Sequence, residues 1–114
     1  MTTTQAPSAR ITAELLRWPG VESGPGRFGA TAFSVSNREI GHLHGDHAAH
    51  FSFPRSQWRE LLADGRIEPH PVFPDREGPA ARRIAGDADT DDVLALLRLN
   101  YERVVEREPV RGQA

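Results

Sequence analysis

The sequence predicts an α+β fold, in which helices pack on one face of an antiparallel sheet of four or five strands and the other face stays partly open. The first observation is a C-terminal stretch, residues 90–105, whose apolar side chains recur at steps of three and four, as on one face of a long helix. The second is a central stretch, residues 28–53, with the alternation and the turn residues of three short strands. The third is the length of 114 residues, which suits one domain with a modest core.

We expect residues 8–108 to form this single domain, between a disordered tail at residues 1–7 and a frayed tail at residues 109–114. Hydrophobic residues make up 38% of the chain and charged residues 26%, as in ordinary globular domains. The absence of cysteine excludes disulfides and cysteine-based metal sites. No apolar run approaches the roughly 20 residues that cross a bilayer, and residues 1–7 lack the charged start and apolar core of a signal peptide. The expected compartment is therefore the cytoplasm.

The net charge of -2 argues against nucleic-acid binding, which generally needs a clustered basic face. Arginines recur along the chain, but acidic residues are interspersed among them. We therefore expect neither a nucleic acid nor a membrane as a partner, whereas a small-molecule ligand is compatible with the composition. The sequence indicates no oligomeric state.

The first helix is predicted to begin near Ser8, whose hydroxyl can cap it, and to end at Pro19-Gly20. Its apolar stripe has spacings of four and three: Ile11, Leu15 and Trp18. Residues 21–27 contain two glycines and a proline and are predicted to be a loop.

Three strands are predicted next, at residues 28–36, 39–44 and 50–53. Between the last two lies the sequence Gly-Asp-His at positions 45–47, and glycine and aspartate tolerate the backbone angles of a tight turn. A second helix is predicted to begin at Pro54, because the missing N–H of proline costs nothing at the first helical position.

The second half of the chain is predicted to contain an extended arm, a strand and the long helix. Residues 66–75 contain three prolines and are predicted to be an edge strand or an extended arm. A short last strand follows at residues 80–84. Thr90 is the predicted N-cap of the C-terminal helix, and Pro109 the predicted end of its apolar pattern.

Four of the chain's five histidines fall within nine consecutive residues, in the predicted hairpin of residues 39–53. Side chains alternate along a strand, so His42 and His44 share one face of the sheet. A three-residue loop at positions 45–47 pairs His42 with His50 and places His50 on that same face. A loop of two or four residues would turn His50 to the other side. We favour the three-residue loop because it also sends the two following phenylalanines to the core.

Three imidazoles on one sheet face, those of His42, His44 and His50, can hold a divalent, zinc-like metal ion, with Asp46 or Glu39 nearby. A His-x-His pair on a strand also occurs as a solvated polar surface, so the pattern alone is not diagnostic. A third interpretation is a pocket that recognises a small organic ligand through imidazole hydrogen bonds.

Residues elsewhere in the chain can complete such a pocket. His70 can close over the same sheet face, and Trp58 or Phe73 can supply an aromatic ring. Histidine also suits acid–base chemistry, but no serine lies in a nucleophile motif. The sequence therefore leaves open whether the protein is an enzyme and whether it holds a cofactor.

Several motifs occur together in a fixed order: Glu39–Asp46 (EIGHLHGD), Phe53–Arg55, Gly65–His70, Pro74–Asp75 and Leu96–Arg103. Over residues 10–107, and through these motifs, the chain resembles the small bacterial "luciferase family" domain, whose function is unknown despite its name. Five residues match the family pattern: His42, His44, Asp46, His70 and Asp75. Two histidines depart from it: His47 and His50. The resemblance therefore implies His42, His44 and His70 as the shared site, and it argues against a metal site that depends on His50.

The order of elements is also loosely similar to the MmcQ/YjbR-like fold, which ends in a long helix with a sequence like that of Tyr101–Val104. Some members of that fold carry a DNA-binding label, which the acidic balance of this chain argues against. The similarity supports the architecture only.

The leading functional interpretation is a small-molecule binding module whose ligand-binding residues are His42, His44, His70, Asp46 and Asp75. The first alternative is a metal-dependent enzyme that uses His42, His44 and His70. The second alternative is a protein-interaction or DNA-associated module.

Overall fold

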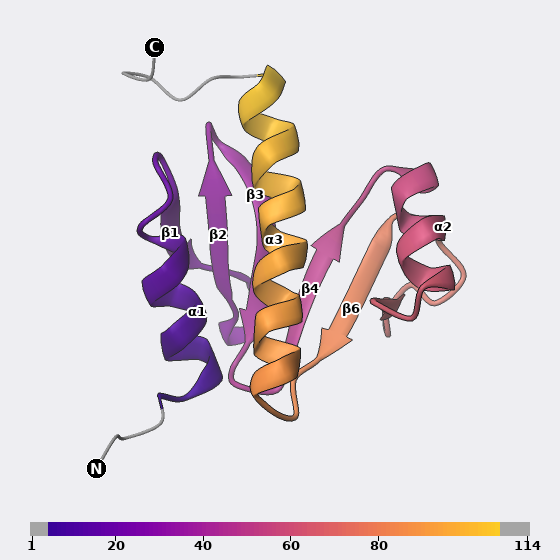
Figure 1. The fold of residues 1–114 in the computed structure, drawn as a ribbon, viewed down its shortest axis with the longest axis horizontal. Coiled ribbons are helices and arrows are strands. Elements are labelled where there is room, and N and C mark those ends of the chain that lie inside the picture. Colours follow the sequence, from indigo (N-terminus) through magenta and orange to yellow (C-terminus); the bar gives the residue numbers. More distant parts are fainter. Residues whose placement is uncertain (1–4, 108–114) are drawn as a thin grey trace.

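The structure of the protein is a computed structural model, and residues 5–107 of it are described here. In this part of the chain an antiparallel sheet of six strands, in the order β1-β2-β3-β4-β6-β5, packs with three helices (Figure 1). The strands are β1 (Glu22–Pro25), β2 (Thr31–Val35), β3 (Arg38–His44), β4 (Ala48–Ser52), β5 (Glu68–Pro69) and β6 (Pro79–Arg83). The helices are α1 (Pro7–Leu15), α2 (Arg55–Ala63) and α3 (Asp87–Arg107). The predicted α+β class is confirmed, with more strands than expected.

Helices α1 and α3 lie across one face of the sheet, and α2 lies beside β6 (Figure 1). The sheet residues that face α3 are fully buried or nearly so, among them Phe33, Leu43 and Ala49. They pack with Val93, Leu96 and Leu97 of α3 in one apolar cluster. Because side chains alternate, the next residues along each strand point to the opposite face, which these two helices leave uncovered.

A buried asparagine on α3 joins the helix to the sheet. Asn100 is 2% exposed, and its amide donates hydrogen bonds to the carbonyl oxygens of Ile40 (3.0 Å) and Ser52 (3.2 Å). These two carbonyls belong to β3 and β4, so one side chain ties α3 to both strands of the central hairpin.

The predicted register of that hairpin is confirmed. His42 pairs with His50, and His44 pairs with Ala48. The turn closes with a hydrogen bond from the His47 N–H to the His44 carbonyl, and Gly45 takes the positive φ of 58° that glycine adopts at little cost. Phe51 and Phe53 are buried, as the three-residue loop requires.

The start of α1 differs from its prediction. The helix begins at Pro7, its N-cap is Ala6, and no side chain caps it from that position, so the predicted capping by the Ser8 hydroxyl is wrong. Proline at the start lacks an N–H, and the next free donor is the Ser8 N–H. That group donates to Oδ1 of Asp46 at 2.9 Å, so the cap comes from the distant hairpin turn.

The segment before β2 also differs. Residues 21–27, predicted as a loop, contain β1, which pairs only with β2 at the edge of the sheet. An edge strand accepts glycine and proline because one side of it needs no ladder hydrogen bonds. The strand predicted from residue 28 instead begins at Thr31, because Phe28 has a left-handed φ of 56° in the short turn Arg27–Gly29.

The long helix begins one turn earlier than predicted. Its first residue is Asp87, so the prediction of Thr90 as N-cap is wrong: Thr90 is 1% exposed, inside the first turn, and its backbone N–H donates to the Gly86 carbonyl. Asp89 accepts a hydrogen bond from the Ala85 N–H and pairs with Arg82, and these contacts stabilise the added turn.

The predicted tails fall mainly outside the described residues. Residues 1–4 and 108–114, and with them Pro109, are not described, while Pro7 already belongs to α1. Within residues 5–107, every helix is too short or too polar to span a membrane.

Candidate functional site

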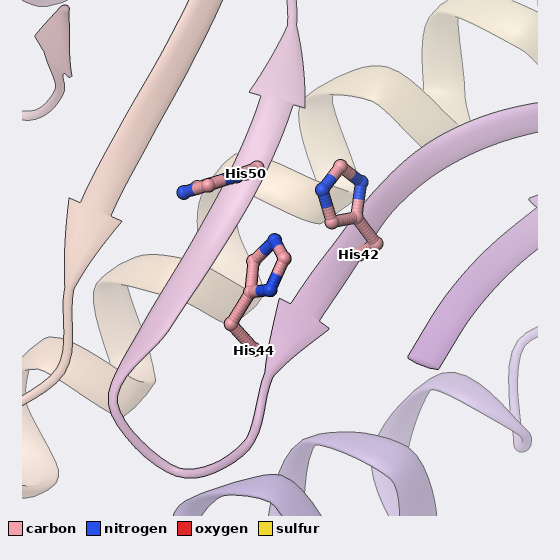
Figure 2. A group of neighbouring side chains, drawn as sticks. All are labelled: His42, His44 and His50. Carbon is pink, nitrogen blue, oxygen red and sulfur yellow. The ribbon is translucent and has the colours of Figure 1, made fainter. Parts of the chain in front are cut away.

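Three histidines lie close together on the uncovered sheet face (Figure 2). His42 and His44 come from β3 and His50 from β4, and their inward-facing neighbours Leu43 and Ala49 are buried against the helices. The ring centroids are 5.0 Å apart for His42 and His44, and 5.2 Å apart for His42 and His50. The rings of His44 and His50 are 4.4 Å apart. Strand alternation and hairpin register together produce this cluster, which we call the histidine cluster.

A fourth imidazole reaches the histidine cluster from a distant segment. His70 follows β5, and its ring lies 4.4 Å from that of His50 and 5.3 Å from that of Phe73. Its Nδ1 accepts a hydrogen bond from the Val72 N–H at 3.1 Å, and its carbonyl accepts one from the Phe73 N–H. The segment is therefore curled around His70 and holds its ring over the cluster.

These side chains line a cavity of about 540 Å³. Its lining consists of Gly26, Arg27, Phe28, Glu39, His42, His44, His50, His70, Val72 and Phe73. Three apolar residues at the cavity are exposed to solvent: Phe28 (95%), Val72 (69%) and Phe73 (43%). They form what we call the apolar rim. The cavity thus combines a polar base of imidazoles with an apolar border.

Burial and mutual repulsion favour the neutral form of His44, His50 and His70. Burial, and after it the positive charges that His44, His70 and His42 would carry, lower the pKa of His50 to about 4. The pKa of His44 is lowered by burial and then by His42, and that of His70 by burial and then by His42 and His44. At neutral pH these rings therefore carry lone pairs that can accept a hydrogen bond or bind a metal ion.

Glu39 determines which nitrogen of His42 is free. Its Oε2 lies 3.0 Å from Nδ1 of His42. A carboxylate can only accept a hydrogen bond, so Nδ1 carries the proton. The Nε2 atom of a neutral His42 then has the lone pair.

The histidine cluster is compatible with a metal ion. One ring nitrogen from each of His42, His44 and His50 lies within 4.8 Å of the other two. Zinc–nitrogen bonds of about 2.0–2.1 Å place tetrahedral ligands roughly 3.4 Å apart, so small side-chain rotations would bring the three nitrogens to bonding positions. Neutral imidazole is also the commonest metal ligand in proteins.

Several residues predicted for the site lie elsewhere. Asp46 accepts a hydrogen bond from the Ser8 N–H at the start of α1. Hydrogen bonding by the Ser8 side chain, and then by its backbone N–H, lowers the pKa of the Asp46 carboxyl. Asp75 is exposed and does not line the cavity. Trp58 is buried on α2, where its indole donates to the Pro79 carbonyl at 2.9 Å. His47 lies in the hairpin turn, outside the histidine cluster.

Sequence reasoning missed four residues that line the cavity: Gly26, Arg27, Phe28 and Val72. The only signal of Phe28 and Val72 in the sequence is an apolar side chain within a turn-forming segment rich in glycine or proline. Sequence reasoning also left the role of His50 undecided. The three-residue hairpin loop placed His50 on the same face as His42 and His44, whereas the family pattern has no histidine at this position. The structure places His50 in the cluster, between His44 and His70.

A comparison with protein-family models matches residues 37–100 to the Luciferase domain. The matched segment covers more than half of the 114-residue chain and runs from the start of the histidine hairpin into α3. It contains all four histidines of the cavity and Glu39. Searches of the curated proteins and of the solved structures found no match to the chain. The looser similarity to the MmcQ/YjbR-like fold has no support among these comparisons.

Proposed function

This chain belongs to the Luciferase domain family, and we propose that it is a small-molecule binding domain whose ligand occupies the histidine-lined cavity. One observation carries the proposal: four imidazoles and three exposed apolar side chains border a single cavity of about 540 Å³. Sites for small organic ligands commonly have volumes of about 300–1,000 Å³, mostly apolar walls and a few polar groups that fix orientation.

The apolar rim supports this function. Phe28 is 95% exposed and its backbone has a left-handed φ of 56°. Such a conformation costs a bulky residue on the order of 1–3 kcal/mol and persists where the surrounding structure enforces it. An organic ligand in the cavity would cover Phe28, Val72 and Phe73 and remove their apolar surface from water.

A metal-dependent enzyme is the second candidate, favoured by the three ring nitrogens within 4.8 Å of one another. A nucleic-acid partner has less support. The cavity lining holds one arginine, Arg27, and one carboxylate, Glu39, which gives no basic surface for phosphates.

Fluorescence titration with anilinonaphthalene sulfonate, an aromatic anion, tests the proposed function. We expect saturable binding to the native protein, weakened about tenfold by Val72→Ser combined with Phe73→Ser, because each change removes apolar contact area. The matched control is Leu16→Ser, which removes another exposed apolar side chain (50% exposed) at the end of α1.

Cooperative unfolding of each variant, followed by circular dichroism, separates binding to the cavity from binding to a loosened fold. The proposal fails if the folded protein shows no saturable binding. It also fails if Leu16→Ser weakens binding as much as the double substitution in the rim.

A further inference from the structure

The three histidines of the cluster are held by paired strands and not by loops. His42 and His50 are direct partners in the β3–β4 register, and His44 lies two residues further along β3. Gly41 and Leu43, which alternate with them, face the core. Because the backbone beneath is fixed, bringing three nitrogens from a separation within 4.8 Å to metal-bonding distance needs side-chain rotation only.

Glu39 gives His42 the outer partner that metal-bound histidines usually have. Its Oε2 accepts the Nδ1–H of His42 at 3.0 Å. A carboxylate in this position fixes the tautomer and the orientation of the ring, and it makes the other nitrogen more basic. This leaves the Nε2 of His42 as the nitrogen that a metal ion would meet.

His70 is arranged for a different role. Its Nδ1 is occupied by the Val72 N–H at 3.1 Å. A neutral imidazole that accepts at Nδ1 carries its proton at Nε2, so the free nitrogen is a hydrogen-bond donor and has no lone pair for a metal. Its ring packs against that of His50 at a tilt of 59°, with the ring centroids 4.4 Å apart, which keeps this donor at the cavity.

The charges of the lining determine which ligand such a centre would accept. Three neutral imidazoles leave a divalent ion with its full double positive charge. Among the lining residues, the one carboxylate, Glu39, is engaged by His42, and Arg27 adds a positive charge. Three protein ligands also leave one position of a tetrahedral ion open. An anionic oxygen satisfies that position, and the apolar rim suits an organic body attached to it.

We propose that His42, His44 and His50 bind a divalent, zinc-like metal ion, and that the cavity takes a small organic carboxylate, with its oxygen on the metal and on the Nε2–H of His70. The inference deepens the proposed function by naming the class of ligand, and its metal part can be tested without any ligand. In this inference the third metal ligand is His50, and not His70 as in the metal-dependent alternative drawn from the sequence. Glu39 is a positioning residue for His42.

Metal content tests the first part. The purified protein is stripped with a chelator, dialysed against zinc and analysed for metal. We expect about one zinc ion per chain, as for a three-histidine site. His50→Ala should lose it, while His47→Ala, which removes a histidine of the same hairpin outside the cluster, should keep it. Visible absorption of the cobalt-loaded protein reports the coordination independently.

The positioning role of Glu39 is tested by zinc affinity. Glu39→Ala should lower zinc affinity by about 10- to 100-fold, the usual effect of losing such an outer partner. Glu39→Gln, which keeps an acceptor oxygen but not the charge, should recover part of that loss. Equal zinc affinity in native protein and Glu39→Ala would overturn the positioning role. Absence of zinc from the folded native protein would overturn the metal centre.

Calorimetric titration with benzoate tests the ligand part, with benzyl alcohol as the uncharged control. Benzoate should bind the zinc-loaded protein at least tenfold more tightly than the stripped protein, and benzyl alcohol should show no such gain. His70→Ala should keep the zinc and weaken benzoate binding by roughly tenfold, the effect of losing one hydrogen bond to a charged group. Loss of zinc in His70→Ala would overturn the division of roles.

The two proposals fail separately. If the protein binds anilinonaphthalene sulfonate but takes up no zinc, the small-molecule site is supported and the metal centre is disproved. If the protein binds zinc but neither the dye nor benzoate, the metal centre is supported, whereas the proposed ligand class and the binding function are disproved.

Discussion

A β-carbon added to Gly41 would lie 2.5 Å from Cδ2 of Leu97, so the Leu97 side chain of α3 packs directly on this glycine and would have to shift for any larger residue. The same residue lies next to His42 in β3, and the contact therefore links the packing of the core to the position of the histidine cluster. His50 contributes to the arrangement as well, since its carbonyl oxygen would lie 3.2 Å from the added carbon.

Gly41→Ala should lower the free energy of unfolding by about 1–3 kcal/mol, the usual cost of overpacking a core. Urea denaturation measures this change. Gly24→Ala in β1 is the control, because a β-carbon there meets nothing within 4 Å and should change stability little. If both variants have the same stability, the close approach of α3 to β3 does not need glycine.

Asn100→Ala should cost about 2–4 kcal/mol of unfolding free energy. The change leaves a cavity, and it leaves the carbonyls of Ile40 and Ser52 without their amide donor. Glu106→Ala, at an exposed position of the same helix, is the control and should stay within about 0.5 kcal/mol of the native protein. Thermal unfolding of both variants checks the prediction, and a native-like midpoint for Asn100→Ala would contradict it.

Stability of the metal-free protein should fall as the pH is lowered from about 6.5 toward about 4, because His50 has a lowered pKa in the folded state. The unfolded chain binds a proton at its ordinary pKa, whereas the folded chain binds it only near the lowered one. Protonation therefore favours the unfolded state in this pH window. The stability of the fold with a neutral His50 is fully present above the window and is lost progressively as the pH falls through it. Partial exposure of the ring reduces the effect to about 1–2 kcal/mol.

Urea denaturation across that pH window gives the free energy of unfolding of the native protein and of His50→Gln. The difference between the two isolates the effect of His50 titration. His50→Gln should show a flatter dependence, since the neutral amide does not titrate. His47→Gln should keep the native slope, because His47 lies outside the histidine cluster. Parallel curves for all three proteins would show that His50 does not titrate differently on folding.

Asp46→Ala should weaken the start of α1 and leave the cavity intact. Its Oδ1 accepts the Ser8 N–H at 2.9 Å, and loss of such a cap costs about 0.5–2 kcal/mol. Binding of zinc and of anilinonaphthalene sulfonate should not change. Asp75→Ala, the matched carboxylate outside the cavity, should affect neither property. Loss of binding in Asp46→Ala would restore Asp46 to the ligand site that the sequence motif suggested.

Much of the architecture could be predicted because it depends on neighbours in the chain. The three- and four-residue spacing of apolar side chains identified α3, although its acidic first turn depends on Arg82, which the spacing does not include. The parity of a three-residue turn was enough to pair His42 with His50. The edge strand β1 escaped prediction because its glycine and proline are typical of loops.

The histidine cluster was therefore determined by the sequence itself, since strand alternation and one turn place His42, His44 and His50 on the same sheet face. Only the tertiary structure decided what surrounds it. His70 reaches His50 across twenty residues, Phe28 borders the cavity from a left-handed turn, and Asp46 leaves the site for the start of α1. Periodicity records which way neighbouring side chains point, whereas these contacts depend on how separate segments pack and on where unpaired backbone donors are left.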